Sequence, residues 1–67
     1  MNKTERHQEI LNLLISKERI EINELCEMFH IVPMTARRDL KELEEQGKLI
    51  RTHGGAALPP EKEDVNL

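Results

Sequence analysis

The sequence predicts a mostly α-helical domain with a small β-hairpin, and three observations lead to this prediction. Apolar residues recur at helical spacing in three segments, over residues 4–16, 23–30 and 33–46. Only a few residues separate the second segment from the third, which is typical of a helix-turn-helix. Two short stretches around Gly54 and Gly55 alternate between apolar and polar residues and predict the hairpin.

The first segment opens with a capping signal. Thr4 can act as the N-cap, and Glu5 lies in the first turn, where the helix dipole favours acids. The apolar stripe of this helix consists of Ile10, Leu11 and Leu14. The letters KERIEI then place Ile20 and Ile22 on either side of Glu21, which predicts a short extended segment.

The second segment, residues 23–30, is also expected to be a helix. Either Glu21 or Asn23 can cap its start. Its buried face is expected to consist of Leu25, Met28 and Phe29. Ile31 and Val32 then form the short connection to the third segment.

The third segment has both a start and a stop signal. Pro33 stands at the first helical position, where its missing N–H costs nothing, and Gly47 ends the helix after Gln46. At about 100° per residue, the core stripe of this helix comprises Ala36, Leu40 and Leu43. The opposite face carries Met34, Arg38, Lys41 and Glu45, and its two flanks carry Arg37 and Thr35.

Charge is unevenly distributed along this third helix. Its basic residues are exposed in the first two turns, whereas Glu42, Glu44 and Glu45 follow in the last turns. In a helix-turn-helix the N-terminal part of the second helix enters the DNA major groove, which suits this polarity. The alternative is a solvated surface helix, because Arg38–Glu42 and Lys41–Glu45 are i,i+4 pairs that contribute about 0.2–0.5 kcal/mol each.

Composition limits the class of protein. The 67 residues suffice for one small domain, and a single aromatic residue cannot build base-stacking platforms for single-stranded nucleic acid. One cysteine excludes an internal disulfide, and the polar N-terminus does not resemble a signal peptide, so we expect a cytoplasmic protein. The net charge of −3 divides into −1 on residues 1–58, with nine Lys/Arg and ten Asp/Glu, and −2 on residues 59–67.

Neither catalysis nor metal binding is indicated. The sequence offers no credible nucleophile–base pair, so we expect no enzyme. Cys26 and His30 have a metal-compatible i,i+4 spacing, but structural zinc needs four ligands. Nothing indicates that His7 and His53 converge with them, and we expect no metal and no cofactor. The paired glycines lack the Lys-Ser/Thr of a phosphate loop and most simply supply positive φ angles in a turn.

The stretch TARRDLKELEEQGKLIRTHGGA resembles the N-terminal DNA-binding domain of the DeoR family of bacterial transcriptional regulators. The family pattern there is close to T-I-R-R-D-L, then L-x-x-x-G, then R-x-H-G-G-A. The matching residues are Thr35, Arg37, Arg38, Asp39, Leu40, Leu43, Gly47, Arg51, His53, Gly54, Gly55 and Ala56. The resemblance covers about residues 5–57, and it departs from the pattern at two positions. Ala36 replaces a bulkier aliphatic residue, and Val32 replaces a serine cap.

The resemblance implies a three-helix winged helix-turn-helix over residues 1–58 that binds double-stranded DNA. It further implies a repressor of sugar or carbohydrate metabolism genes. Family members continue into a C-terminal domain that binds a phosphorylated metabolite and forms homo-oligomers. We interpret residues 59–67 as a polar linker leading to such a domain, which is absent from this chain. The alternative is a winged helix that serves as a protein–protein interaction module, which would suit an acidic chain.

Position and resemblance together suggest how the third helix contacts DNA. We expect Arg38 to read a guanine through a bidentate contact. The resemblance places Arg37 and Thr35 at phosphates. Met34 and Lys41 are expected as their neighbours in the groove.

Three further contacts are expected outside the third helix. Arg51 and His53, with Thr52 between them, lie on the hairpin and would touch the DNA backbone or the minor groove. Arg6 would contact phosphate from the first helix. Asp39 is expected to face away from DNA and to orient a basic side chain.

Overall fold

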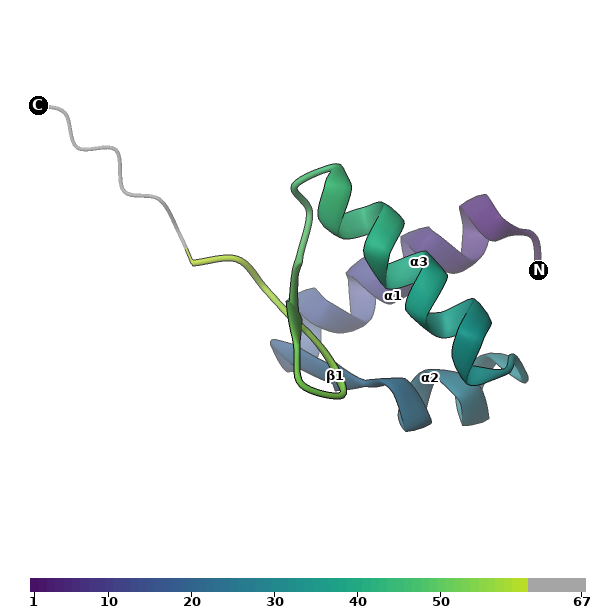
Figure 1. The fold of residues 1–67 in the computed structure, drawn as a ribbon. Coiled ribbons are helices and arrows are strands. Elements are labelled where there is room, and N and C mark those ends of the chain that lie inside the picture. Colours follow the sequence, from purple (N-terminus) through teal and green to yellow (C-terminus); the bar gives the residue numbers. More distant parts are fainter. Residues whose placement is uncertain (61–67) are drawn as a thin grey trace, which may run out of the picture.

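The computed structural model describes residues 1–60, which form three helices and a three-stranded antiparallel sheet (Figure 1). In chain order the elements are α1 (Lys3–Lys17), β1 (Arg19–Glu21), α2 (Ile22–Phe29), α3 (Pro33–Glu45), β2 (Ile50–Thr52) and β3 (Gly55–Ala57). The expected winged helix-turn-helix is confirmed, with α2 and α3 as the helix pair and β2 and β3 as the wing. Residues 61–67, which make up most of the expected linker, lie outside the described residues. Within residues 1–60, no helix is both long and apolar enough to cross a membrane.

Helix α1 starts one residue earlier than expected, because its N-cap is Asn2 and not Thr4. The Asn2 side chain accepts a hydrogen bond from the Glu5 N–H at 2.8 Å, and the Glu5 carboxylate accepts one from the Asn2 N–H at 3.2 Å. This reciprocal capping box satisfies two backbone donors that would otherwise lack partners. Ile10 and Leu14 are buried as expected, whereas Leu11 is only partly buried.

Helix α2 begins at Ile22, which the sequence placed in the extended segment. Glu21 is its N-cap residue, and the Glu21 N–H donates to the Glu24 carboxylate at 3.0 Å. Ile22 and Leu25 form the buried face, and at about 100° per residue this face leaves Met28 on the flank. The expectation that Met28 is buried was therefore wrong, since its exposed fraction is 47%.

Helix α3 follows after a short turn and ends as the sequence predicted. Val32 is the N-cap residue but makes no side-chain capping bond, and Pro33 opens the helix. At the other end Gly47 has φ +76°, and the N–H groups of Gly47 and Lys48 donate to the carbonyls of Glu44 and Leu43 at 2.9 and 3.0 Å. This pair of bonds is the Schellman arrangement that glycine favours at the end of a helix.

The sheet has the order β1-β3-β2, so the predicted hairpin gains a third strand from the segment after α1. Ile20 pairs with Ala56 and Glu21 with Gly55. Of the two adjacent glycines, only Gly54 has a positive φ, +86°, whereas a Cβ on Gly55 would lie 2.0 Å from the carbonyl oxygen of Ile20. The prediction that both glycines serve the turn was therefore wrong for Gly55, which allows β1 and β3 to approach.

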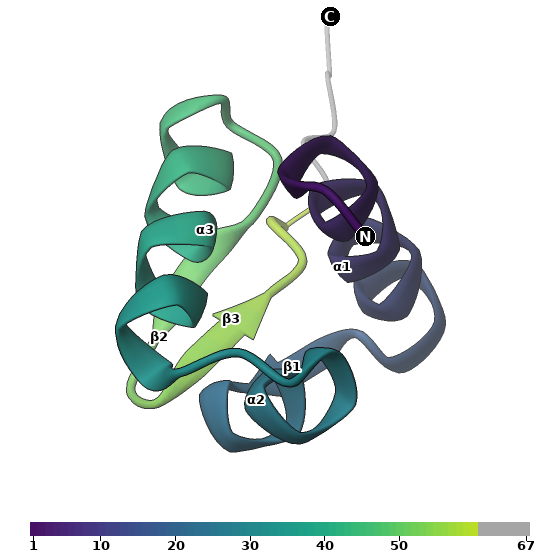
Figure 2. The same ribbon diagram turned by 90° about the vertical axis from the view of Figure 1, so that its right-hand side faces the viewer.

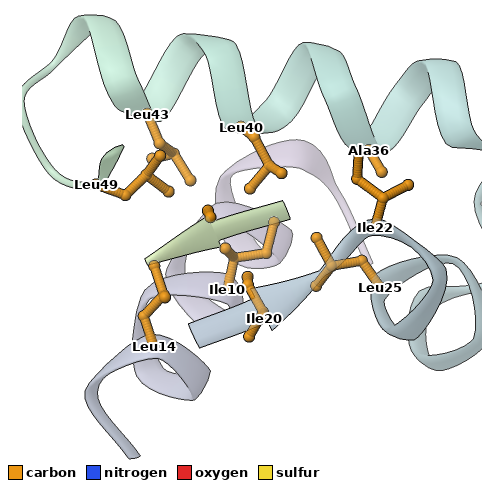
Figure 3. Packing of buried hydrophobic residues seen from close by; sticks show 10 residues of the cluster. Ile10, Leu14, Ile20, Ile22, Leu25, Ala36, Leu40, Leu43 and Leu49 are labelled. Carbon is orange, nitrogen blue, oxygen red and sulfur yellow. The ribbon is translucent and has the colours of Figure 1, made fainter. Parts of the chain in front are cut away.

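The core brings together side chains from the three helices and the sheet. Figure 2 shows α1 and α3 on opposite sides of β3, with α2 across one end. The buried apolar residues are Ile10, Leu14, Ile20, Ile22, Leu25, Ala36, Leu40, Leu43, Leu49 and Ala56, of which Figure 3 labels all but Ala56. The predicted stripe of α3 is confirmed, and it fixes which face of α3 remains outside.

Candidate nucleic-acid interface

The face of α3 opposite the core, together with its two flanks, carries the α3 residues predicted to contact DNA. Met34, Arg37, Arg38 and Lys41 are all exposed, whereas Thr35 is half-buried. In Figure 3 the side chains of Ala36, Leu40 and Leu43 point from α3 into the core, away from this face. Of the five α3 residues expected at the DNA, the structure thus leaves four exposed and one, Thr35, half-buried.

The ion pairs of the solvated-helix alternative do not form in the described part of the chain. Arg38–Glu42 and Lys41–Glu45 are both absent from the salt bridges among residues 1–60. Glu42 instead lies 3.1 Å from the Nζ of Lys3 on α1. The arginines and the lysine of the exposed face therefore have no carboxylate partner on their own helix.

Asp39 is the one polar residue buried among residues 1–60, with an exposed fraction of 1%. Its carboxylate accepts hydrogen bonds from the Nε of Arg6 at 2.5 Å and from the Nη2 of Arg6 at 3.0 Å. The Nε2 of His7 lies 3.0 Å from the same carboxylate. This confirms the expectation that Asp39 orients a basic side chain, and it ties α3 to α1.

The surroundings of Asp39 act on its pKa in opposite directions. Burial raises the pKa, but the hydrogen bonds from Arg6 and His7 and their charges outweigh burial, so the pKa of Asp39 lies below its ordinary value. The hydrogen bond to Asp39 correspondingly raises the pKa of Arg6. The carboxylate is therefore charged in the folded protein at neutral pH.

Arg6 does not join the exposed face of α3. Its side chain is 15% exposed, and its guanidinium group is directed at Asp39. The expected phosphate contact of Arg6 stays a prediction, while the structure gives it an intramolecular partner. Sequence reasoning missed His7 in this cluster, because the two partners are 32 residues apart and no local pattern links them.

The wing lies beside α3 and is attached to α2. Its turn is fixed by a backbone bond from the Ile22 N–H to the Gly54 carbonyl at 2.8 Å. His53 is exposed in this turn, whereas Arg51 and Thr52 are half-buried. The Nε of Arg51 is buried and has no hydrogen-bond partner among residues 1–60.

A cluster of possible metal ligands does occur, but not the one weighed from the sequence. His7, Asp39 and Glu42 bring ligand atoms within 4.8 Å of one another. Arg6 already binds Asp39, and Lys3 binds Glu42, so both carboxylates have cationic partners. With three ligands and two competing cations, the cluster suits an ion-pair network better than a structural zinc site.

This arrangement, an exposed basic helix face in a helix-turn-helix with a wing beside it, defines a winged helix-turn-helix DNA-binding domain. The chain belongs to the DeoR-like helix-turn-helix domain family, which it matches over residues 6–62. This confirms the resemblance. The family consists of regulatory DNA-binding domains and not of enzymes.

Similar proteins include repressors of several bacteria. The glycerol-3-phosphate regulon repressor of Escherichia coli is 48% identical over 59 residues, which are 88% of this chain and 23% of the repressor. The lactose phosphotransferase system repressor of Lactococcus lactis is 48% identical over 65 residues, or 97% of this chain and 26% of the repressor. The repressor of the same name from Staphylococcus aureus (strain NCTC 8325 / PS 47) is 50% identical over 56 residues, which are 84% of this chain and 22% of that repressor. The chain thus spans about a quarter of the length of these relatives, and no solved structure matches it significantly.

Proposed function

We propose that this domain binds a specific operator in double-stranded DNA and represses genes of sugar or carbohydrate metabolism. The observation that carries the proposal is the exposed face of α3, where Arg37, Arg38 and Lys41 lie free of carboxylate partners among the described residues. The related repressors of a glycerol-3-phosphate regulon and of lactose phosphotransferase systems support the kind of gene that is controlled.

The proposed contacts divide into base reading and positioning. Arg38 points away from the core and reads a guanine with its two-pronged guanidinium group. Arg37 and Thr35 hold phosphates, and Lys41 and Met34 complete the surface in the groove. The remaining contacts come from the wing, through Arg51 and His53.

Regulation is proposed to come from outside this domain. In this proposal residues 1–58 bind DNA, and residues 59–67 link them to a C-terminal domain. That domain binds a phosphorylated metabolite and holds the protein together as a cytoplasmic homo-oligomer. Two copies would then occupy half-sites about one helical turn of DNA apart. The threefold to fourfold greater length of the related repressors supports a further domain of this kind.

The direct test is a titration of fluorescently labelled duplexes at two salt concentrations. One duplex comes from the promoter region beside the gene, and the control has the same composition in scrambled order. We expect selective binding to the promoter duplex. We also expect the affinity to fall steeply as salt is raised, because each phosphate contact makes the negative slope of log K against log salt steeper by about 0.9. Equal binding to both duplexes by this chain and by a tethered dimer would refute the proposal.

Two substitutions separate the proposed roles. Arg38→Ala should weaken binding to the selected duplex by about 1–3 kcal/mol and reduce sequence preference. Arg37→Ala should weaken binding to both duplexes and lower the salt slope by about 1. Lys17→Ala, which removes one positive charge from α1 together with its ion pair to Glu24, is the control and should leave selectivity unchanged.

A protein–protein interaction module is the second candidate, favoured by the sequence pI of about 5.6. Such a module would bind neither duplex, and its binding to a partner would not weaken with salt as DNA binding does. The same titration therefore distinguishes the two candidates.

A further inference from the structure

Large apolar side chains are exposed where α2 meets α3. The large hydrophobic side chains that are exposed among residues 1–60 are those of Met1, Ile15, Met28, Val32, Met34 and Ile50. Three of these six belong to the helix-turn-helix. Val32 and Met34 flank Pro33 at the N-terminal end of α3, with exposed fractions of 61% and 65%.

Met34 belongs to the same surface as the arginines. It precedes Arg38 by four residues, so the two side chains are neighbours on one face, with about 5–6 Å between their Cβ atoms. The first turn of α3 contains no acidic residue. An apolar side chain at this place faces no charge on its own turn, and it gains contacts only if a partner covers it.

We infer that Met34 reads the 5-methyl group of a thymine beside the guanine that Arg38 contacts. The inference rests on the proposed function and adds to it the identity of one neighbouring base. The thymine methyl is the apolar group that base pairs present in the major groove. A methionine side chain is unbranched and polarisable, so it adapts its shape to such a group.

The spacing of the two side chains fits this assignment. Successive bases of one strand are about 3.4 Å apart along the duplex axis. A separation of about 5–6 Å between the Cβ atoms of Met34 and Arg38 therefore places the thymine one or two base pairs from the guanine. Shorter Val32 lies at the N-cap, outside the helical face shared by Met34 and Arg38.

The test removes the methyl group from the DNA and leaves every hydrogen-bonding atom in place. A duplex is first selected by this chain from a randomised pool. Each thymine near the guanine that depends on Arg38 is then replaced by uracil, one at a time. Affinities of the wild type, Met34→Ala and Ile15→Ala are measured by fluorescence anisotropy, and thermal melting checks that each variant is folded. Ile15 is the matched control, because it is a similarly exposed apolar residue on α1, with an exposed fraction of 70%.

For the wild type and for Ile15→Ala we expect one uracil substitution to weaken binding about fourfold. This corresponds to about 0.8 kcal/mol of binding free energy, since a tenfold change in Kd corresponds to about 1.4 kcal/mol. For Met34→Ala the thymine and uracil duplexes should bind equally. An unchanged thymine preference in folded Met34→Ala would overturn the inference and leave the proposed function intact. Failure of the chain to select any duplex would instead overturn the proposed function, and the inference with it.

Discussion

Replacing Asp39 by asparagine removes one charge from a buried cluster and keeps the shape of the side chain. In the wild type the carboxylate accepts two hydrogen bonds from Arg6 and lies 3.0 Å from the Nε2 of His7. An asparagine offers one oxygen in place of two, and its amide N–H groups would face other donors. The substitution therefore removes an ion pair and leaves the guanidinium of Arg6 with one neutral acceptor in place of a two-oxygen carboxylate.

The expected loss of stability is about 2–3 kcal/mol. Hydrogen bonds to charged groups contribute about 1.5–3 kcal/mol, and removing one partner of a buried ion pair costs about 3–5 kcal/mol. The side chain of Arg6 is 15% exposed, so water can partly solvate its charge. The expected loss of stability therefore does not exceed the lower end of the range for a buried ion pair. A chain of 67 residues has a free energy of unfolding of roughly 3–10 kcal/mol, and the loss is a large share of it.

Urea unfolding followed by circular dichroism measures this loss. Thermal melting should show a midpoint about 8–24 °C lower, since 1 kcal/mol corresponds to about 4–8 °C in a domain of this size. Glu42→Gln on the same helix is the matched control, because the Lys3–Glu42 pair is much more exposed and its loss should cost no more than about 1 kcal/mol. Adding Arg6→Met to Asp39→Asn should cost less than the sum of the two single changes. A loss below about 0.5 kcal/mol in Asp39→Asn, or strict additivity in the double variant, would refute the reasoning.

The same variant predicts a difference in acid stability. The pKa of Asp39 is lower in the folded protein than its unfolded value of about 3.9, so its contribution is fully present above that value. The contribution is lost as the pH falls through the lower, folded pKa. Between neutral pH and strong acid the wild type should therefore lose more stability than Asp39→Asn, and equal losses would contradict this assignment.

Two further predictions concern the backbone, and urea unfolding tests both. Gly55→Ala should destabilise the domain by about 3 kcal/mol or more, because its Cβ would lie 2.0 Å from the carbonyl oxygen of Ile20, whereas Gly54→Ala should cost only about 1–2 kcal/mol for its positive φ. Equal costs would refute the proposed role of Gly55 in strand approach. Val32→Ser should add about 1 kcal/mol, because serine can accept from an N–H group in the first turn of α3 and valine cannot. An unchanged urea midpoint would show that this N–H group gains nothing from a cap.

Elements that depend on local signals were predictable from the sequence. The start of α3 at Pro33 and its end before Gly47 follow from residues within a turn of each boundary, and the buried stripe of α3 follows from its 3.6-residue period. One feature of the fold was not predictable, because it depends on residues far apart in the chain. Strand β1 joins the hairpin through the close approach of Ile20 and Gly55, and no local pattern encodes that pairing.

The candidate site was likewise predictable where it depends on local pattern and not where it depends on contacts between helices. Periodicity alone placed Arg38 and Met34 on the face opposite the core, but it could not assign partners to the charges beside them. The sequence predicted Glu42 as the ion-pair partner of Arg38, because the two residues are four apart and a helical wheel contains no information about neighbouring helices. In the folded chain, packing of α1 against α3 brings Lys3 to Glu42 and Arg6 to Asp39 instead.

This exchange of partners explains how an acidic chain can present a basic surface. The net charge of −3 counts all acids equally, wherever they lie. Asp39 is buried and neutralised by Arg6, and Glu42 is drawn towards Lys3 and His7, so neither carboxylate faces the side of α3 that carries Arg37 and Arg38. At an ionic strength of about 0.15 M charges are screened over about 8 Å, so a phosphate at this face responds mainly to the nearest side chains. The sign of the local charge, and not the pI, therefore decides whether this surface attracts DNA.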